Sequence, residues 1–154
     1  MLSLDYQIFS LQDLICEVVN ETKMLTHDHL IEHTDTMDVS IRADRGLLKQ
    51  LLRALIDNSL KYTPAGGTII LNYSLSKNRI AIKIEDTGIG IPEDELSHIF
   101  DRFFRVDKAR SHSIGGFGLG LSIVQLIVLS HKGTITATSQ LGKVTTMIIN
   151  IPRD

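Results

Sequence analysis

The amino-acid sequence predicts an α+β fold, a two-layer sandwich in which about three helices cover one face of a mixed, mostly antiparallel sheet. Three observations predict this architecture. Apolar residues recur at helical spacing in three segments, and strand-like alternation marks two pairs of segments joined by short turns. The chain also has 154 residues, a length typical of one domain. We therefore expect residues 1–154 to form a single domain.

The first helix is predicted over residues 11–25. Its apolar residues recur at helical spacing and are expected to be buried: Leu11, Leu14, Ile15, Val18, Val19 and Leu25. Cys16 is expected to be a small buried apolar residue, and a single cysteine excludes an internal disulfide framework. Two short extended segments are predicted next, at residues 29–33 and 39–43.

Asp44 is the predicted N-cap of a second helix. The apolar face of this helix is expected to comprise Leu47, Leu48, Leu51, Leu52, Leu55 and Ile56. The helix should end near Tyr62, because Pro64 and the two glycines at 66–67 do not readily continue it. Residues 68–75 and 79–86 then alternate as strands, with a hairpin turn at 77–78.

Residues 87–118 lack a strong period, apart from a short helical piece around 93–105. A stretch of this length in a compact domain usually forms a functional loop. A third helix is predicted over residues 119–131, followed by strands at 134–140 and 144–151. His131 is expected at the end of that helix, where a positive charge would suit the helix dipole.

Composition excludes several classes of function. The formal net charge is −2, which gives no electrostatic footprint for nucleic acid. No apolar run is long enough to span a membrane and the N-terminus does not resemble a signal peptide, so the chain as given is expected to be soluble, without membrane contact of its own. Three histidines lie close together, at His27, His29 and His33, but no zinc-like partner pattern accompanies them.

Two polar sites stand out among the predicted elements. Asn58 lies at the edge of the second helix's apolar face, with Lys61 on the same flank; such an amide either braces local structure or coordinates a ligand. Asp86 ends a strand and is followed by Gly88 and Gly90. This cluster either caps a strand-ending turn or lets a ligand with an exocyclic amine approach.

Two further segments fall in or after the aperiodic region. Glycines at the start of the third helix leave backbone N–H groups open where the helix dipole favours phosphate, yet neither standard phosphate-loop spacing is present. Residues 100–110 combine phenylalanines with basic residues. They form either a solvated basic face or a lid whose Arg105, with Arg102 or Arg110, reaches a polyphosphate.

The order of these segments resembles the ATP-binding catalytic domain of sensor histidine kinases. This domain belongs to the superfamily of gyrase, Hsp90, histidine kinases and MutL, and the resemblance covers the chain from about Phe9 to Pro152. It implies the Bergerat ATP-binding fold. DNSLKYTP is similar to the family's N box, so Asn58 would bind Mg2+ between the ATP phosphates, Lys61 would approach the phosphates and Tyr62 would pack near the nucleoside.

The other segments resemble the remaining boxes. DTGIGIP is similar to the first glycine box, in which Asp86 would accept from the adenine N6 amine and the following residues would admit the base: Gly88, Gly90 and Ile91. FDRFFR resembles the F box, in which Phe100 and Phe103 would anchor a lid and Arg105 would reach the γ-phosphate. The second glycine box would line the phosphates with Gly116, Gly118, Leu119, Gly120 and Leu121. Thr145 resembles a family threonine near the adenine.

The implied activity is a protein-histidine kinase reaction on Mg2+-ATP, with Asn58, Lys61 and Arg105 as catalytic residues. The acceptor histidine would lie on a separate dimerisation domain, because none of the six histidines here is followed by the expected acceptor box. The resemblance further implies relay to a response regulator. The parent protein would be a homodimer anchored in the bacterial cell membrane, with this domain in the cytoplasm.

Departures from the family pattern leave two alternatives open. Ala54 replaces the usual first Asn of the N box, and the same place carries a catalytic Glu in the ATP-hydrolysing branches, which argues against a gyrase-like ATPase. Phe117 replaces a usual Thr, and Val144 replaces the second glycine of a late turn. The alternatives are a degenerate nucleotide-binding module that acts by regulated protein contact, and an anti-sigma-type serine kinase.

Overall fold

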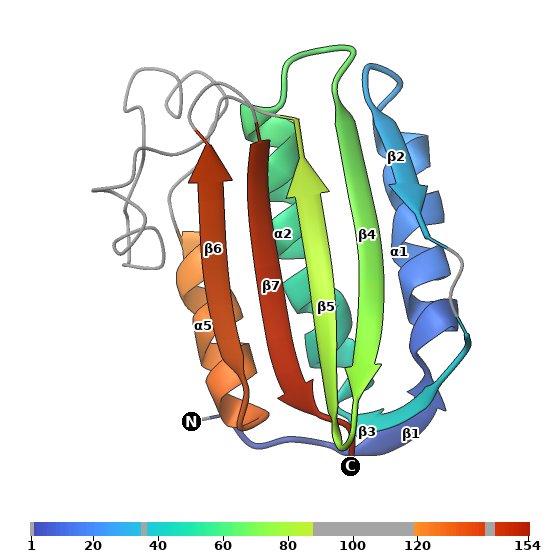
Figure 1. The fold of residues 1–154 in the computed structure, drawn as a ribbon, viewed down its shortest axis with the longest axis vertical. Coiled ribbons are helices and arrows are strands. Elements are labelled where there is room, and N and C mark those ends of the chain that lie inside the picture. Colours follow the sequence, from blue (N-terminus) through green and yellow to red (C-terminus); the bar gives the residue numbers. More distant parts are fainter. Residues whose placement is uncertain (1, 35–36, 88–118, 141–143) are drawn as a thin grey trace.

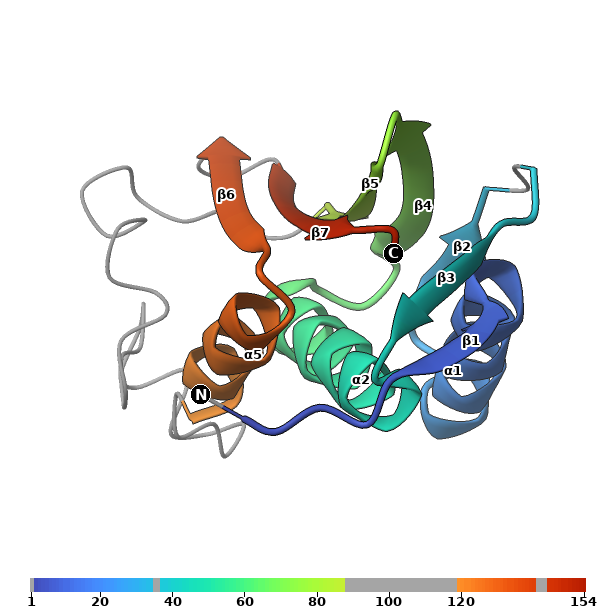
Figure 2. The same cartoon turned by 90° about the horizontal axis from the view of Figure 1, so that it is seen from below.

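The computed structural model describes residues 2–34, 37–87, 119–140 and 144–154. In these residues, three helices cover one face of a five-stranded sheet, and a second, two-stranded sheet lies at the lower end of the molecule in Figure 1. The view from below separates the helical layer from the sheet (Figure 2). The predicted α+β sandwich is confirmed. None of the helices in the described residues is both long and apolar enough to cross a membrane.

Helix α1 spans Leu11–Leu25 and begins after Ser10, whose Oγ accepts a hydrogen bond from the Asp13 amide at 3.1 Å. Its predicted apolar face is buried except for Leu25, which is 70% exposed because the helix ends there and the chain continues extended. The expected burial of Cys16 is also wrong. This residue lies about 100° around the helix from Ile15, is half-buried, and its Sγ lies 3.6 Å from His33 Nε2.

Helix α2 spans Arg45–Tyr62, and Asp44 is its N-cap as predicted, with Oδ1 accepting from the Leu47 amide at 3.0 Å. Its apolar residues pack under the sheet: Leu48, Leu51, Leu52, Leu55 and Ile56 are at most 1% exposed, and Leu47 is partly buried against them. Surface ion pairs join α2 to α1, since Lys49 Nζ lies 2.9 Å from Glu17 and 3.0 Å from Glu21. Hydrogen bonds from Lys49 and Arg45 lower the pKa of Glu17.

Helix α5 spans Leu119–Ser130 and buries Val124, Ile127 and Val128. His131 follows it and is only 5% exposed. Its Nε2 accepts a hydrogen bond from the Asp44 amide at 3.1 Å, and its Nδ1 lies 2.9 Å from the Ile127 carbonyl oxygen. His131 therefore lies at the end of the helix, as expected. Its imidazole connects the end of α5 to the start of α2.

The main sheet has the order β2–β4–β5–β7–β6, and its strands are Leu30–His33, Thr68–Ser76, Arg79–Asp86, Val144–Pro152 and Thr134–Gln140 respectively. Only the β2–β4 pair is parallel. The predicted turn between β4 and β5 is present, with Lys77 at a φ of 37°.

The two-stranded sheet pairs β1 (Gln7–Ser10) with β3 (Ser40–Ala43) in antiparallel register. Strand β1 was not predicted. It has only four residues and its one large aliphatic side chain, Ile8, is 77% exposed, so the segment carries no alternation that marks a buried face.

Candidate functional site

The register of two neighbouring strands brings together two of the predicted site residues. In the β5–β7 ladder, Asp86 and Thr145 are direct partners, and each is 5% exposed. Successive side chains alternate across a sheet, so Asp86 faces the helices as Ile84 does, and Thr145 does so as Met147 does. A carboxylate and a hydroxyl therefore lie side by side where the apolar core face ends.

Hydrogen bonds orient the Thr145 hydroxyl. Ser139 Oγ donates to the Val144 carbonyl oxygen at 3.2 Å and lies 3.1 Å from Thr145 Oγ1. With the Ser139 proton used in this way, Thr145 donates to Ser139 and keeps lone pairs as acceptors. A buried carboxylate beside a hydroxyl acceptor suits a ligand edge that carries an exocyclic amine. These two acceptors therefore fit an amine-bearing base such as adenine.

The last turns of α2 carry the N-box residues to the same end of the molecule. Figure 1 shows the C-terminal end of α2, the C-terminal end of β5 and the start of β7 at the same end of the molecule. Asn58 and Lys61 are half-buried there, as expected for the edge of the apolar face, and Tyr62 is the last helical residue. Helix α5 begins at Leu119, Gly120 is its second residue, and Leu121 packs against the core.

A magnesium ion fits Asn58 in one respect, because its amide supplies the oxygen that this hard cation prefers. The described residues contain no group of three or more His, Cys, Asp or Glu side chains that could hold a metal. An ion at Asn58 would therefore take most of its ligands from phosphate and water oxygens, as magnesium commonly does with nucleotides.

Other predicted site residues lie outside the described part of the chain. They are Gly88, Gly90, Ile91, Phe100, Arg102, Phe103, Arg105, Arg110, Gly116, Phe117 and Gly118, together with the helical piece expected around residues 93–105. The roles given to them stay predictions.

The structure also shows a contact that sequence reasoning missed. Thr87 follows Asp86, and its Oγ1 accepts from the Thr68 amide at 2.9 Å while its own amide donates to the Thr68 carbonyl oxygen at 3.1 Å. These bonds fix the chain immediately after Asp86 to the start of β4. No sequence signal marks Thr87 for this role, because a threonine beside glycines is common in any turn.

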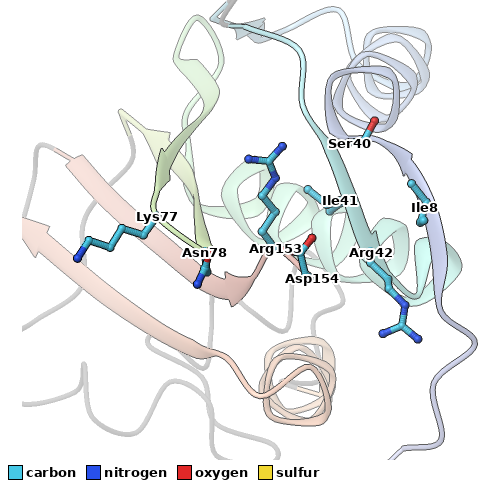
Figure 3. Close-up of a pocket in the computed structure, with 8 residues that line it drawn as sticks. All are labelled: Ile8, Ser40, Ile41, Arg42, Lys77, Asn78, Arg153 and Asp154. Atoms are coloured by element: carbon cyan, nitrogen blue, oxygen red, sulfur yellow. The ribbon is translucent and has the colours of Figure 1, made fainter.

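A cavity of about 340 Å³ lies at the other end of β5, beside the β4–β5 turn, and is separate from this site. Its lining includes Arg42, Lys77 and Arg153, whose side chains extend in different directions (Figure 3). Arg42 also lies over the Tyr6 ring, 4.2 Å from its centroid. The three cations do not converge on a common point, so the cavity does not have the geometry of an anion site.

Comparisons with known proteins identify the family. Residues 43–154 match the family described as histidine kinase-, DNA gyrase B-, and HSP90-like ATPase. The sensor histidine kinase RppB of Synechocystis sp. is 36% identical over 96% of this chain and 33% of its own length. The sensor histidine kinase WalK of Bacillus subtilis is 37% identical over 95% of this chain and 24% of its own length.

Solved structures agree with the sequence relatives. The catalytic domain of histidine kinase ThkA superposes with a TM-score of 0.82 at 28% identity, covering 97% of this chain and 99% of that one. ThkA in complex with the response regulator protein TrrA gives a TM-score of 0.80 at 27% identity, covering 98% of this chain and 42% of that one.

The chain spans about a third of RppB and about a quarter of WalK, so it corresponds to one part of each relative. That part superposes on an isolated catalytic domain over nearly its whole length. The chain therefore belongs to the histidine kinase-, DNA gyrase B- and HSP90-like ATPase family, and within that family it is similar to the catalytic domains of sensor histidine kinases.

Proposed function

We propose that this domain binds Mg2+-ATP and donates the γ-phosphoryl group to a histidine on a separate dimerisation domain. The observation that carries the proposal is the buried pair of Asp86 and Thr145 at the end of the core face, beside the C-terminal end of α2. The pair would accept hydrogen bonds from the adenine edge. The phosphates would then extend toward Asn58 and Lys61, with Arg105 and the second glycine box completing their surroundings.

In the proposed reaction an imidazole nitrogen of the acceptor histidine attacks the γ-phosphorus. A nitrogen–phosphorus bond forms, the bond from the γ-phosphorus to the β,γ-bridging oxygen breaks, ADP leaves, and the imidazole loses its proton to solvent. The protein contributes mainly position and charge neutralisation, which dominate catalysis of phosphoryl transfer. When bound at Asn58, Mg2+ would neutralise phosphate charge.

We further propose that the parent protein is a membrane-anchored homodimer with this domain in the cytoplasm, and that the phosphoryl group passes on to a response regulator. Support for the last step comes from the likeness to ThkA, which has been solved in complex with the response regulator TrrA. Two observations favour a kinase domain over a gyrase-like ATPase: the likeness to named sensor kinases, and Ala54 at the place of the ATPase glutamate.

The test combines the domain with the dimerisation segment of its own parent protein and with γ-labelled ATP. We expect an acid-labile, base-stable phosphohistidine on the added segment. If ATP binds but no labelled histidine forms, the kinase proposal is wrong and the alternative of a nucleotide-binding module without transfer activity is supported. Labelled serine on an added partner would instead support the serine-kinase alternative.

A further inference from the structure

Helix α2 ends in a way that prevents the usual backbone cap. Its C-cap residue, Thr63, is extended, with φ −108° and ψ 119°. The last four carbonyl groups of a helix need outside donors, and the amide that follows the C-cap often supplies one. Here that residue is Pro64, which has no N–H. The amides of Gly66 and Gly67 donate to Asp28 and Pro64 instead.

The imidazole of His29 supplies a side-chain donor to the C-cap residue itself. Its Nε2 lies 2.7 Å from the Thr63 carbonyl oxygen, and a carbonyl only accepts, so Nε2 carries the proton. Its Nδ1 lies 3.2 Å from Thr26 Oγ1, and this oxygen in turn accepts from the Asp28 amide at 3.4 Å. The Thr26 hydroxyl therefore holds the ring in the orientation that points Nε2 at the end of α2.

Two backbone hydrogen bonds fix the segment that carries His29. The Gly66 amide donates to the Asp28 carbonyl oxygen at 2.6 Å, and the Leu30 amide donates to the Gly67 carbonyl oxygen at 3.0 Å. Both bonds reach the turn after α2. Of the three contacts, only the one made by His29 reaches the C-cap residue, two positions after Lys61.

The same C-cap residue lies close to the chain that follows Asp86. A Cβ atom at Gly67 would collide with the Thr63 methyl group and would come within 3.1 Å of Thr87 Oγ1. Gly67 therefore lies between Thr63 and Thr87 with no room for a side chain of its own. A shift of Thr63 would change the distance between the last turn of α2 and Thr87, the residue that follows Asp86.

We propose that His29 is a positioning residue that caps α2 and thereby sets the place of Asn58 and Lys61 relative to Asp86. This inference rests on the proposed function, because it assumes that the two ends of the nucleotide bind at these two places. Loss of the cap frees the last turn of α2, which carries the phosphate-binding side chains. Asp86 and Thr145 keep their positions when the cap is lost, because the pairing of β5 with β7 holds them.

The test compares four variants of the 154-residue chain: His29→Ala, His29→Asn, His29→Gln and, as a matched control, His27→Ala. A Gln side chain places its amide nitrogen near the position of Nε2, whereas Asn places it near Nδ1, so only Gln retains the donor to Thr63. His27 has an exposed side chain two residues away. Calorimetry measures the affinity of each variant for Mg2+-ATP and for adenosine.

We expect His29→Ala and His29→Asn to weaken Mg2+-ATP binding by about two- to tenfold, the factor that corresponds to one neutral hydrogen bond. Adenosine affinity should stay at the wild-type value, His29→Gln should restore Mg2+-ATP binding, and His27→Ala should behave as wild type. If His29 had a purely structural role, its replacement would lower the affinity for Mg2+-ATP and for adenosine by the same factor, or would change neither, and His29→Gln would bind no better than His29→Asn. Either result overturns the inference. Failure of the wild-type chain to bind Mg2+-ATP overturns the proposed function as well, so the two failures are distinguishable.

Discussion

Replacement of Asp86 by Asn is the most direct perturbation of the proposed adenine site. The side chain is 5% exposed and its strand partner is Thr145, so a ligand that reaches the end of the core face meets both. Asn has nearly the same shape as Asp and leaves the β5 strand intact. The substitution removes the negative charge and one of the two carboxylate oxygens, and it introduces a donor.

The magnitude follows from the kind of hydrogen bond that is lost. A hydrogen bond to a charged group contributes about 1.5–3 kcal/mol. Because Asp86 is buried, its hydrogen bond to the adenine amine would be shielded from water, and this range therefore applies. We therefore expect the dissociation constant for ATP to rise by about ten- to a hundredfold.

The assay is calorimetric titration of wild type and Asp86→Asn with ATP and with inosine triphosphate, which has an oxygen in place of the N6 amine. Wild type should prefer ATP, and the preference should disappear or reverse in the variant, because the new amide donates to the inosine oxygen. Glu85→Gln is the matched control. Glu85 is the next residue, points to the opposite face of the sheet, and accepts from Thr146 Oγ1 at 3.3 Å.

Two results would refute this reasoning. An unchanged ATP affinity in Asp86→Asn would show that the adenine does not bind at this carboxylate. An equal loss with both nucleotides would show that Asp86 supports the local structure and does not read the amine. Thermal unfolding of each variant distinguishes the second result from simple loss of the fold.

Three further predictions concern the metal, the surface charges and the packing. Asn58→Ala should make ATP affinity much less dependent on Mg2+, and titrations with and without the ion would detect an unchanged dependence that contradicts the assignment. The pKa of Glu17 is lowered from its ordinary value of 4.5, chiefly by Lys49, so the stability it contributes is complete above that value and is lost as pH falls through the lowered pKa. Urea unfolding of Glu17→Gln across this range should show a weaker decline with acid than wild type does; parallel curves would contradict it. Gly67→Ala should lower the free energy of unfolding by about 1–3 kcal/mol, because its Cβ would collide with the C-cap threonine of α2, whereas Gly46→Ala, whose Cβ meets only ordinary contacts, should raise it by up to about 1 kcal/mol.

Much of the local structure was predictable because its signals are local. Asp44 marks the start of α2 through a side chain that reaches an amide three residues away, and Pro64 marks its end. Strand β1 was not predictable, since its stability comes from pairing with β3 and its own four residues show no buried face. The burial of Leu25 was overestimated because helical periodicity does not say where a helix ends relative to its neighbours.

The candidate site was predictable only in its components. The order of the motifs indicated which residues belong to it, and the alternation of β5 already places Asp86 on the same face as Ile84. Thr87 carried no sequence signal for its bonds to Thr68, because they form between segments that meet only in the folded chain.

By itself, the sequence determined the helices, the hairpin and the family, because caps, turns, periodicity and motif order are written in neighbouring residues. Only the tertiary structure decided that Asp86 lies beside Thr145, that β2 pairs with β4 in parallel, and that His29 caps α2. The physical reason is that periodicity selects a face but not a partner. Strand register and the choice of a hydrogen-bond partner depend on contacts between distant segments, which form only when the core packs.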